Sequence, residues 1–325
     1  MKLLFLNCGG TIVQEHSDAK MAWTASLANL IERTGLDIDF REEELFSGLA
    51  ANFTLRDIMQ VAHVLHSADD VAGTIITIGT DVAEEVGFAI DYLGPYPGPV
   101  VLVGASKPTQ VQGYDGVSNL YNAITALQSS ALRAGDVVFT IADRFFDASR
   151  LFKQDSELLD GFSASPGPIG EMRNGQASIP FNCSRDSATH GVTLNDGKTF
   201  EKIARVGVLM THVDMDLDTK SLGRLDGLVI AGMGTGSMPD DVRSKIEEDL
   251  TAHIPCVVST RCPSGSAFNE YFYRNSTEKL DRGRFIYREF FTLNYLKARM
   301  KLQIDLSARM SGFEVEPYLE KFFTR

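Results

Sequence analysis

Two threonines that follow glycines are the residues of this sequence best placed to carry chemistry. Thr11 follows Gly10 at the end of an apolar run, and Thr80 follows Gly79 at the end of a second run, with Asp81 next to it. A threonine hydroxyl is a weak nucleophile at neutral pH, so a base or a cation must help to remove its proton. If the two corners lie side by side, they place two hydroxyls and a carboxylate at one crevice, with Thr11 as the candidate nucleophile.

The same residues also have a purely structural interpretation. Two consecutive glycines are typical of a tight turn, and a threonine at that place is typical of a helix cap. Taken alone, the stretch LLFLNCGGTI at residues 3–12 is compatible with either interpretation.

The elements that must position these corners are expected to be buried parallel strands. Apolar and β-branched runs occupy residues 3–6, 73–78, 100–103 and 137–141, and helix-type patterns lie between them at residues 25–35, 54–65, 82–93 and 118–127. This alternation predicts an α/β fold with a doubly wound parallel sheet and right-handed crossovers. Ligands of such sheets bind outside the carboxyl ends of the strands, which is where both corners would lie. The polar residues 13–22 show neither period and predict a mobile loop beside the site, which could act as a lid.

The second half of the chain predicts a separate, smaller α/β domain. The alternation stops beyond Asp147, and the segment at 184–198 is polar and turn-forming. Further strand patterns lie at 206–210, 228–230 and 256–259, and helix patterns at about 240–252 and 293–306. We therefore expect an N-terminal domain at 1–185, a linker at 186–203 and a C-terminal domain at 204–325.

Composition limits the class of protein. A chain of 325 residues is long enough for two cores, and its formal charge of −12 argues against a nucleic-acid partner, which would require a basic surface. No apolar run is long enough to span a membrane, and the short apolar start does not resemble a secretory signal. The cysteines lack metal spacing and a paired framework, which favours a reducing compartment and a soluble, cytoplasmic protein without a metal site. They are Cys8, Cys183, Cys256 and Cys262.

Several other residues have a functional and a structural interpretation, and the structural one is favoured for each. Cys8 could be a thiol nucleophile, but a buried cysteine at a strand end is commoner. His63 and His66 have no third metal ligand nearby, which favours a surface position. The glycines at 232–236 lack the spacing of a dinucleotide site, and Asp115 is expected to cap the helix that follows it.

Segments in the same order along nearly the whole chain resemble the bacterial asparaginase and glutaminase family. The stronger matches are CGGTI at 8–12, ITIGTDVAEE at 76–85 and VGASKPTQVQGYDGVSNLYNA at 103–123. The weaker matches are DASRLFKQD at 147–155, AGMGTGSMP at 231–239, STRCPSG at 259–265 and LKARMKLQIDL at 296–306.

The resemblance implies an amidohydrolase that uses water to convert an amide into an acid and ammonia. It implies that Thr11 is the nucleophile and that Lys153 and Asp81 polarise the hydroxyl of Thr80, while Asp81 also receives the ammonium group of the substrate. No metal or organic cofactor is required. It also implies subunits that associate as dimers or tetramers, with each site between the large domain of one subunit and the small domain of a neighbour. The substrate-binding positions that it implies are Gly10, Gly79, Ala51, Asn52, Ala105 and Ser106.

The sequence departs from the family pattern at several positions around the expected site. Residues 13–24 lack the tyrosine that the family carries after its first threonine. Ala50 and Ala51 stand where the family has a Ser-Ser or Ser-Gln pair that binds the substrate. Ile78 replaces a histidine, and Glu270 is the carboxylate nearest to the position that a partner subunit would contribute. Two alternatives therefore stay open: a non-catalytic amino-acid-binding or regulatory protein on the same fold, and an ammonia-supplying subunit of a larger amidotransferase.

Overall fold

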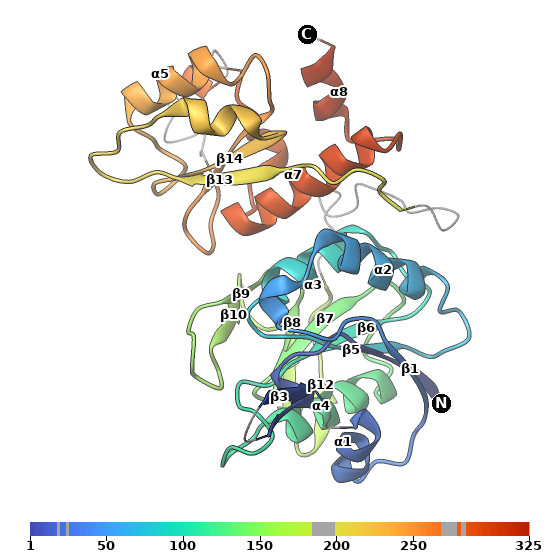
Figure 1. Ribbon diagram of the computed structural model, residues 1–325. Coiled ribbons are helices and arrows are strands. Elements are labelled where there is room, and N and C mark those ends of the chain that lie inside the picture. The colour runs from blue at the N-terminus through green and yellow to red at the C-terminus, as the bar shows by residue number, and fades with distance from the viewer. Residues whose placement is uncertain (18–19, 24–25, 184–198, 268–277, 281–283, 325) are drawn as a thin grey trace. The chain divides into compact units, whose positions relative to one another are not determined.

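The computed structural model (Figure 1) describes residues 1–17, 20–23, 26–183, 199–267, 278–280 and 284–324. The chain divides into two compact units, unit 1 at Met1–Thr199 and unit 2 at Phe200–Arg325. Most of the predicted linker, at 186–198, lies outside the described residues, so the domain boundaries at 185 and 204 stay predictions. Within the described part of the chain, no helix has the length and apolar character needed to cross a membrane.

Unit 1 is built on an eight-stranded sheet with the order β12-β11-β8-β7-β6-β5-β1-β4. Strands β4, β1, β5, β6 and β7 are parallel, as predicted, whereas β8, β11 and β12 extend one edge in antiparallel fashion. The strands are β1 (Lys2–Asn7), β4 (Asp39–Glu44), β5 (Thr74–Thr77), β6 (Val100–Val103), β7 (Val137–Ile141), β8 (Arg144–Asp147), β11 (Gly170–Arg173) and β12 (Gln176–Ser178).

The antiparallel extension begins at a two-residue turn that the sequence did not reveal. Ala142 and Asp143 join β7 to β8, and both have positive φ angles of 49° and 61°. Such a turn suits the twist of a hairpin and is usually signalled by Asn-Gly or Asp-Gly. Ala-Asp carries no such signal, so the reversal of direction could not be predicted.

Helices cover both faces of this sheet (Figure 1). Helices α1 (Leu27–Thr34) and α4 (Gly116–Gln128) cover one face, and α2 (Leu55–His66) and α3 (Ala83–Tyr92) cover the other. Strand β1 is buried on both faces, and its Leu3 and Phe5 pack into the core cluster formed with α1 and α4. The doubly wound parallel arrangement predicted from the sequence is therefore confirmed.

Local signals account for two of the helix ends. The Thr54 hydroxyl accepts the Asp57 N–H at 3.4 Å and the Asp57 carboxylate accepts the Thr54 N–H at 2.7 Å, which confirms the expected start of α2. Gly35, with φ of 73°, ends α1 as predicted. The cap predicted at Thr24 lies outside the described residues, and the residue before α1 is Ser26, whose side chain makes no capping bond.

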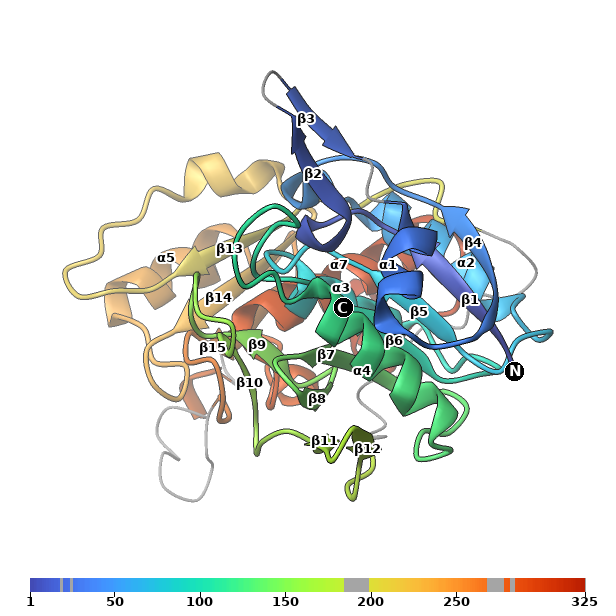
Figure 2. The ribbon, with the colours of Figure 1, turned by 90° about the horizontal axis from the view of Figure 1, so that it is seen from below.

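The segment after Thr11 is an antiparallel ribbon and not the irregular loop expected from its sequence. Strands β2 (Gln14–Ser17) and β3 (Lys20–Trp23) pair with each other, and the ribbon projects from unit 1 (Figure 2). The two strands are paired by backbone hydrogen bonds, which do not require alternating apolar and polar residues. The sequence of this segment therefore gives no periodic signal. A second short ribbon consists of β9 (Leu151–Lys153) and β10 (Phe162–Ala164).

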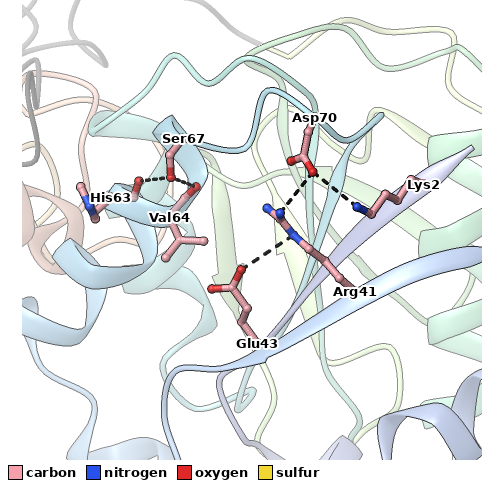
Figure 3. Close-up of polar contacts among 7 residues, drawn as sticks. All are labelled: Lys2, Arg41, Glu43, His63, Val64, Ser67 and Asp70. Carbon is pink, nitrogen blue, oxygen red and sulfur yellow. Dashed lines mark hydrogen bonds and ion pairs between the residues drawn. The ribbon is translucent and has the colours of Figure 1, made fainter.

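Asp70, which follows α2, joins Lys2 at the amino end of β1 to Arg41 on β4 (Figure 3). The Asp70 carboxylate pairs with Lys2 at 3.5 Å and with Arg41 at 3.2 Å, and Arg41 lies 3.8 Å from Glu43. The Ser67 hydroxyl donates to two carbonyl oxygens in the last turn of α2. The ion pairs of Asp70 and Arg41 are exposed to solvent, so each contributes little to stability.

Unit 2 is a smaller α/β unit, as predicted. It contains a parallel sheet of β13 (Val206–Met210), β14 (Gly227–Gly232) and β15 (Cys256–Thr260), with β14 in the centre. Helices α5 (Asp240–Asp249), α7 (Tyr295–Met310) and α8 (Pro317–Phe323) accompany this sheet. Every residue of β14 is buried, which explains its continuous apolar sequence.

Candidate active site

Strands β1 and β5 lie next to each other, and their register brings the two glycine–threonine corners to the same edge of the sheet. Asn7 and Thr77 are register partners at the carboxyl ends of the two strands. The Thr77 hydroxyl donates to the Asn7 side-chain oxygen at 3.2 Å, and the Cys8 N–H donates to the Thr77 carbonyl at 3.2 Å. Both strands therefore end side by side, and the chain leaves each of them at the same level.

Glycine is required at the first corner for two reasons. Gly9 and Gly10 have φ angles of 73° and 87°, which favour glycine, and the Gly9 N–H donates to the Asn7 side chain at 3.0 Å. A Cβ atom on Gly10 would lie 2.6 Å from the backbone nitrogen of Gly79. The two corners thus touch, and Thr11, which is half-buried, begins a short 3-10 turn directly after the contact.

The second corner meets a lysine that is distant in the sequence. Lys153, the last residue of β9, places its Nζ atom 3.1 Å from the Thr80 hydroxyl oxygen and 2.8 Å from the Asp81 carboxylate. Thr80 is buried and Lys153 is mostly so, whereas the Asp81 side chain is 76% exposed. The structure therefore brings together three of the four residues predicted to be catalytic, by direct contact.

The backbone of Lys153 is held from the first turn of α3. The Glu84 carboxylate accepts the Lys153 N–H at 2.9 Å, and Phe162, the register partner on β10, lies under the ammonium group at 5.9 Å. Sequence reasoning missed Glu84 as a contributor to the site. An acidic residue in the first turn of a helix is common because it interacts favourably with the helix dipole, so Glu84 does not by itself indicate a functional role in the sequence.

This arrangement can polarise a hydroxyl. An ammonium group that donates to the Thr80 oxygen favours loss of the threonine proton, and the neighbouring carboxylate balances the added positive charge. Because Lys153 and Thr80 are largely shielded from water, their interaction is stronger than the same contact on the surface.

Two predicted substrate-binding positions belong to a short turn beside the second corner. Ala50, Ala51 and Asn52 form a 3-10 turn, and a Cβ atom on Gly79 would overlap the methyl group of Ala50. Ala51 and Asn52 are exposed to solvent. The turn therefore packs against the second corner through a methyl group.

The loop after β6 also reaches the second corner. A Cβ atom on Gly104 would lie 3.0 Å from the Thr80 methyl group, so the predicted positions Ala105 and Ser106 follow a residue that packs on Thr80. Ala105 is buried and Ser106 is half-buried.

Asp115 organises this loop, which corrects its predicted role as a helix cap. Its carboxylate accepts the N–H groups of Ser106 at 3.0 Å and of Lys107 at 3.0 Å, as well as the Asn119 side-chain amide at 2.9 Å. Asn119 also donates to the Gly104 carbonyl at 3.0 Å. Although Asp115 precedes α4, its side chain makes no capping bond to that helix.

The residues with alternative interpretations take structural positions. Burial raises the pKa of the Cys8 thiol to about 12, which leaves it unreactive, and the His66 ring lies 3.0 Å from the Leu93 carbonyl. The glycine stretch after β14 forms a tight turn in which Met233 pairs with Ser237. Glu270 lies outside the described residues. Among the described residues, no group of three or more His, Cys, Asp or Glu side chains could hold a metal ion.

These features define a class of α/β protein with two units and a hydroxyl–lysine–carboxylate cluster at the carboxyl edge of a parallel sheet. More particularly, the chain belongs to the asparaginase family. The sequence profile described as "Asparaginase, N-terminal" matches residues 2–184, and that of the "Glutaminase/Asparaginase C-terminal domain" matches residues 205–319.

Individual relatives agree with this assignment at low sequence identity. The chain is 27% identical over 323 residues to a probable L-asparaginase of Deinococcus radiodurans, covering 97% of this chain and 95% of the relative. It is 26% identical over 258 residues to L-asparaginase 2 of Escherichia coli, covering 78% and 72%. The fold resembles the crystal structure of a probable cytoplasmic L-asparaginase from Campylobacter jejuni, with a TM-score of 0.81, 24% identity and 99% coverage of both chains.

Proposed function

We propose that this chain hydrolyses the side-chain amide of L-asparagine, or of a related small amide, to the acid and ammonia. Its family membership supports an amide substrate, since the relatives are named for asparagine and glutamine hydrolysis. The observation that carries the proposal is the contact of the Lys153 ammonium with both Thr80 and Asp81, beside a second glycine–threonine corner.

In the proposed reaction Thr11 is the nucleophile. Its hydroxyl oxygen bonds to the substrate carbonyl carbon, the hydroxyl proton passes to the amide nitrogen through neighbouring groups, and the carbon–nitrogen bond breaks to release ammonia. Water then adds to the threonyl ester, and cleavage of the ester bond frees the acid and restores the Thr11 hydroxyl. Backbone N–H groups at the corners of Gly10 and Gly79 are suited to stabilise the oxyanion that forms in each step.

The second cluster supplies proton transfer in this scheme. Lys153 polarises Thr80, so that the Thr80 hydroxyl can exchange a proton with the reacting groups, while Asp81 receives a cationic group of the substrate. The exposed side chain of Asp81 supports the second role, because a carboxylate open to solvent can be reached by a ligand. The scheme requires no metal ion or organic cofactor.

The positions expected to bind the substrate carboxylate differ from the family pattern. Ala50 and Ala51 offer no hydroxyl to a substrate carboxylate, and a charge-assisted hydrogen bond contributes roughly 1.5–3 kcal/mol. We therefore expect weak binding of asparagine itself and better use of a related small amide that lacks the free carboxylate. Binding of asparagine without turnover is the outcome that favours the alternative, a binding or regulatory protein on the same fold.

We further propose that the chain acts as a cytoplasmic homo-oligomer, a dimer or tetramer. The free cysteines among the described residues support a reducing compartment. Light scattering of the purified protein at several concentrations tests the oligomer, and fractionation of cells tests the location.

The nucleophile is tested with Thr11→Ala and Thr11→Ser. Ammonia release is measured with asparagine, glutamine and a panel of small amides, and the quenched parent enzyme is examined by mass spectrometry for an acyl group on Thr11. We expect Thr11→Ala to be inactive and Thr11→Ser to retain part of the activity, since serine keeps the hydroxyl. Equal ammonia release by the parent and Thr11→Ala would rule out the assignment.

A further inference from the structure

A tyrosine from a different part of the chain holds the turn that carries Thr11. The Tyr114 hydroxyl donates to the Ile12 carbonyl at 2.6 Å, across 102 residues of sequence. Ile12 is the middle residue of the 3-10 turn Thr11–Val13 and is fully buried. The bond therefore reaches the carbonyl group of the residue that follows the proposed nucleophile.

The same turn is held from its other side by the second corner. Gly10 touches the backbone at Gly79, and the Val13 N–H donates to the Gly10 carbonyl at 3.2 Å. Close packing fixes the start of the turn, and the bond from Tyr114 fixes its middle. Two independent restraints thus define the backbone on which the Thr11 side chain is mounted.

Tyr114 is itself rigidly placed. Its ring packs against the core cluster that contains Ile12, the Arg33 guanidinium lies over the ring at 5.7 Å, and its neighbour Asp115 is fixed by the loop after β6. A Cβ atom on Gly116 would overlap the hydroxyl group and ring of Tyr114, so the start of α4 leaves the space that the tyrosine fills. This space explains the glycine at the first position of α4.

The Tyr114 hydroxyl is the donor in its bond to the Ile12 carbonyl. Burial raises the pKa of Tyr114 well above its usual value, and Arg33 opposes this shift only in part. The raised pKa favours the protonated phenol, which is the form that donates to the Ile12 carbonyl.

We propose that Tyr114 is a positioning residue for Thr11, which it aligns through the Ile12 carbonyl. The inference rests on the proposed function, in which Thr11 must meet a carbonyl carbon at a near-attack distance. Misplacement of a reacting group by about 1 Å can cost on the order of a hundredfold in rate. Loss of one anchoring hydroxyl, with the ring and the glycine contact retained, is expected to lower kcat about tenfold.

The experiment compares Tyr114→Phe with a matched control, Tyr121→Phe. Tyr121 lies on α4 and donates its hydroxyl to the Gly175 carbonyl at 3.1 Å, so each variant loses one bond from a phenol to a backbone carbonyl. For Tyr114→Phe we expect the lower kcat, a KM within twofold and a pH profile whose limbs do not move. For Tyr121→Phe we expect kcat within twofold of the parent.

Hydrogen–deuterium exchange gives a second reading that does not depend on turnover. The amides of the turn Thr11–Val13 should exchange faster in Tyr114→Phe and at the parental rate in Tyr121→Phe. Gly116→Ala, which favours the helix but displaces the Tyr114 ring, should show the same faster exchange and the same loss of kcat.

The outcomes separate this inference from the proposed function. A parental kcat in Tyr114→Phe overturns the inference, whether or not exchange in the turn changes. A parent protein that releases no ammonia from any amide defeats the amidohydrolase proposal, and unchanged exchange in Tyr114→Phe would then also defeat the anchoring role of the tyrosine. Faster exchange confined to Tyr114→Phe and Gly116→Ala, together with the lower kcat, supports the inference.

Discussion

Gly10 and Gly79 face each other across the end of the sheet, so closely that a methyl group on Gly10 would lie 2.6 Å from the Gly79 nitrogen. They belong to different strand ends, β1 and β5, that are joined by the register of Asn7 with Thr77. The relative position of the two proposed threonines is therefore fixed by backbone contact, before any side chain contributes.

This contact predicts the effect of Gly10→Ala. The variant should lose its ammonia release and also unfold more easily, since the new methyl group must displace backbone atoms. Gly35→Ala is the matched control, because Gly35 has a similar φ of 73° but no atom within 4 Å of its Cβ position. Both variants carry the strain of a positive φ, and the contact should cost Gly10→Ala about 1–3 kcal/mol more in urea unfolding. Equal destabilisation of the two variants would contradict the close approach.

The lysine of the cluster predicts a loss of rate without a loss of fold. Lys153→Met removes the ammonium group from Thr80 and Asp81 but keeps an apolar chain over Phe162, so kcat should fall at least about a hundredfold. Lys2→Met is the control, since Lys2 pairs with Asp70 at the opposite end of the sheet (Figure 3). Ammonia release and circular dichroism are measured for both. A well-folded Lys153→Met with parental kcat would remove the lysine from the mechanism.

Part of this site could be predicted from local sequence, and part could not. Apolar runs that stop at glycine indicated both corners and the sheet edge at which they meet, because burial and turn formation are local properties. Lys153 lies 72 residues from Asp81, and a single lysine carries no sign of what it will meet, so its role came only from family resemblance. Glu84 and Tyr114 act on backbone groups of distant segments, which no periodicity reveals.

Burial of the Cys8 thiol predicts a pH dependence of stability. The folded state raises its pKa to about 12, whereas an unfolded thiol titrates near 8.5, so the folded state disfavours the thiolate. The resulting stability is fully present below about pH 8.5 and is lost as the pH rises toward 12, by up to about 1.4 kcal/mol per pH unit. Urea unfolding between pH 8 and 10 should show a shallower decline for Cys8→Ala than for the parent. Cys262→Ala, at a half-exposed position, should decline like the parent.

Unit 2 contains a buried ion pair, and the effects on stability of replacing its two members should not be additive. On α7 the Lys301 ammonium lies 3.2 Å from the Asp305 carboxylate, which also accepts the Tyr318 hydroxyl at 2.6 Å, and both charged side chains are almost completely buried. Lys301→Met leaves the carboxylate in a buried place without its lysine, which should cost about 3–5 kcal/mol.

Replacing both members removes the uncompensated charge, so Lys301→Met combined with Asp305→Leu should be less destabilising than the two single changes added together. The free energies of unfolding in urea for the parent, the two single variants and the double variant complete the cycle. Lys245→Met, which breaks the exposed pair with Asp216, should leave the stability nearly unchanged. Strict additivity of the two buried substitutions would show that the lysine and the aspartate do not stabilise each other.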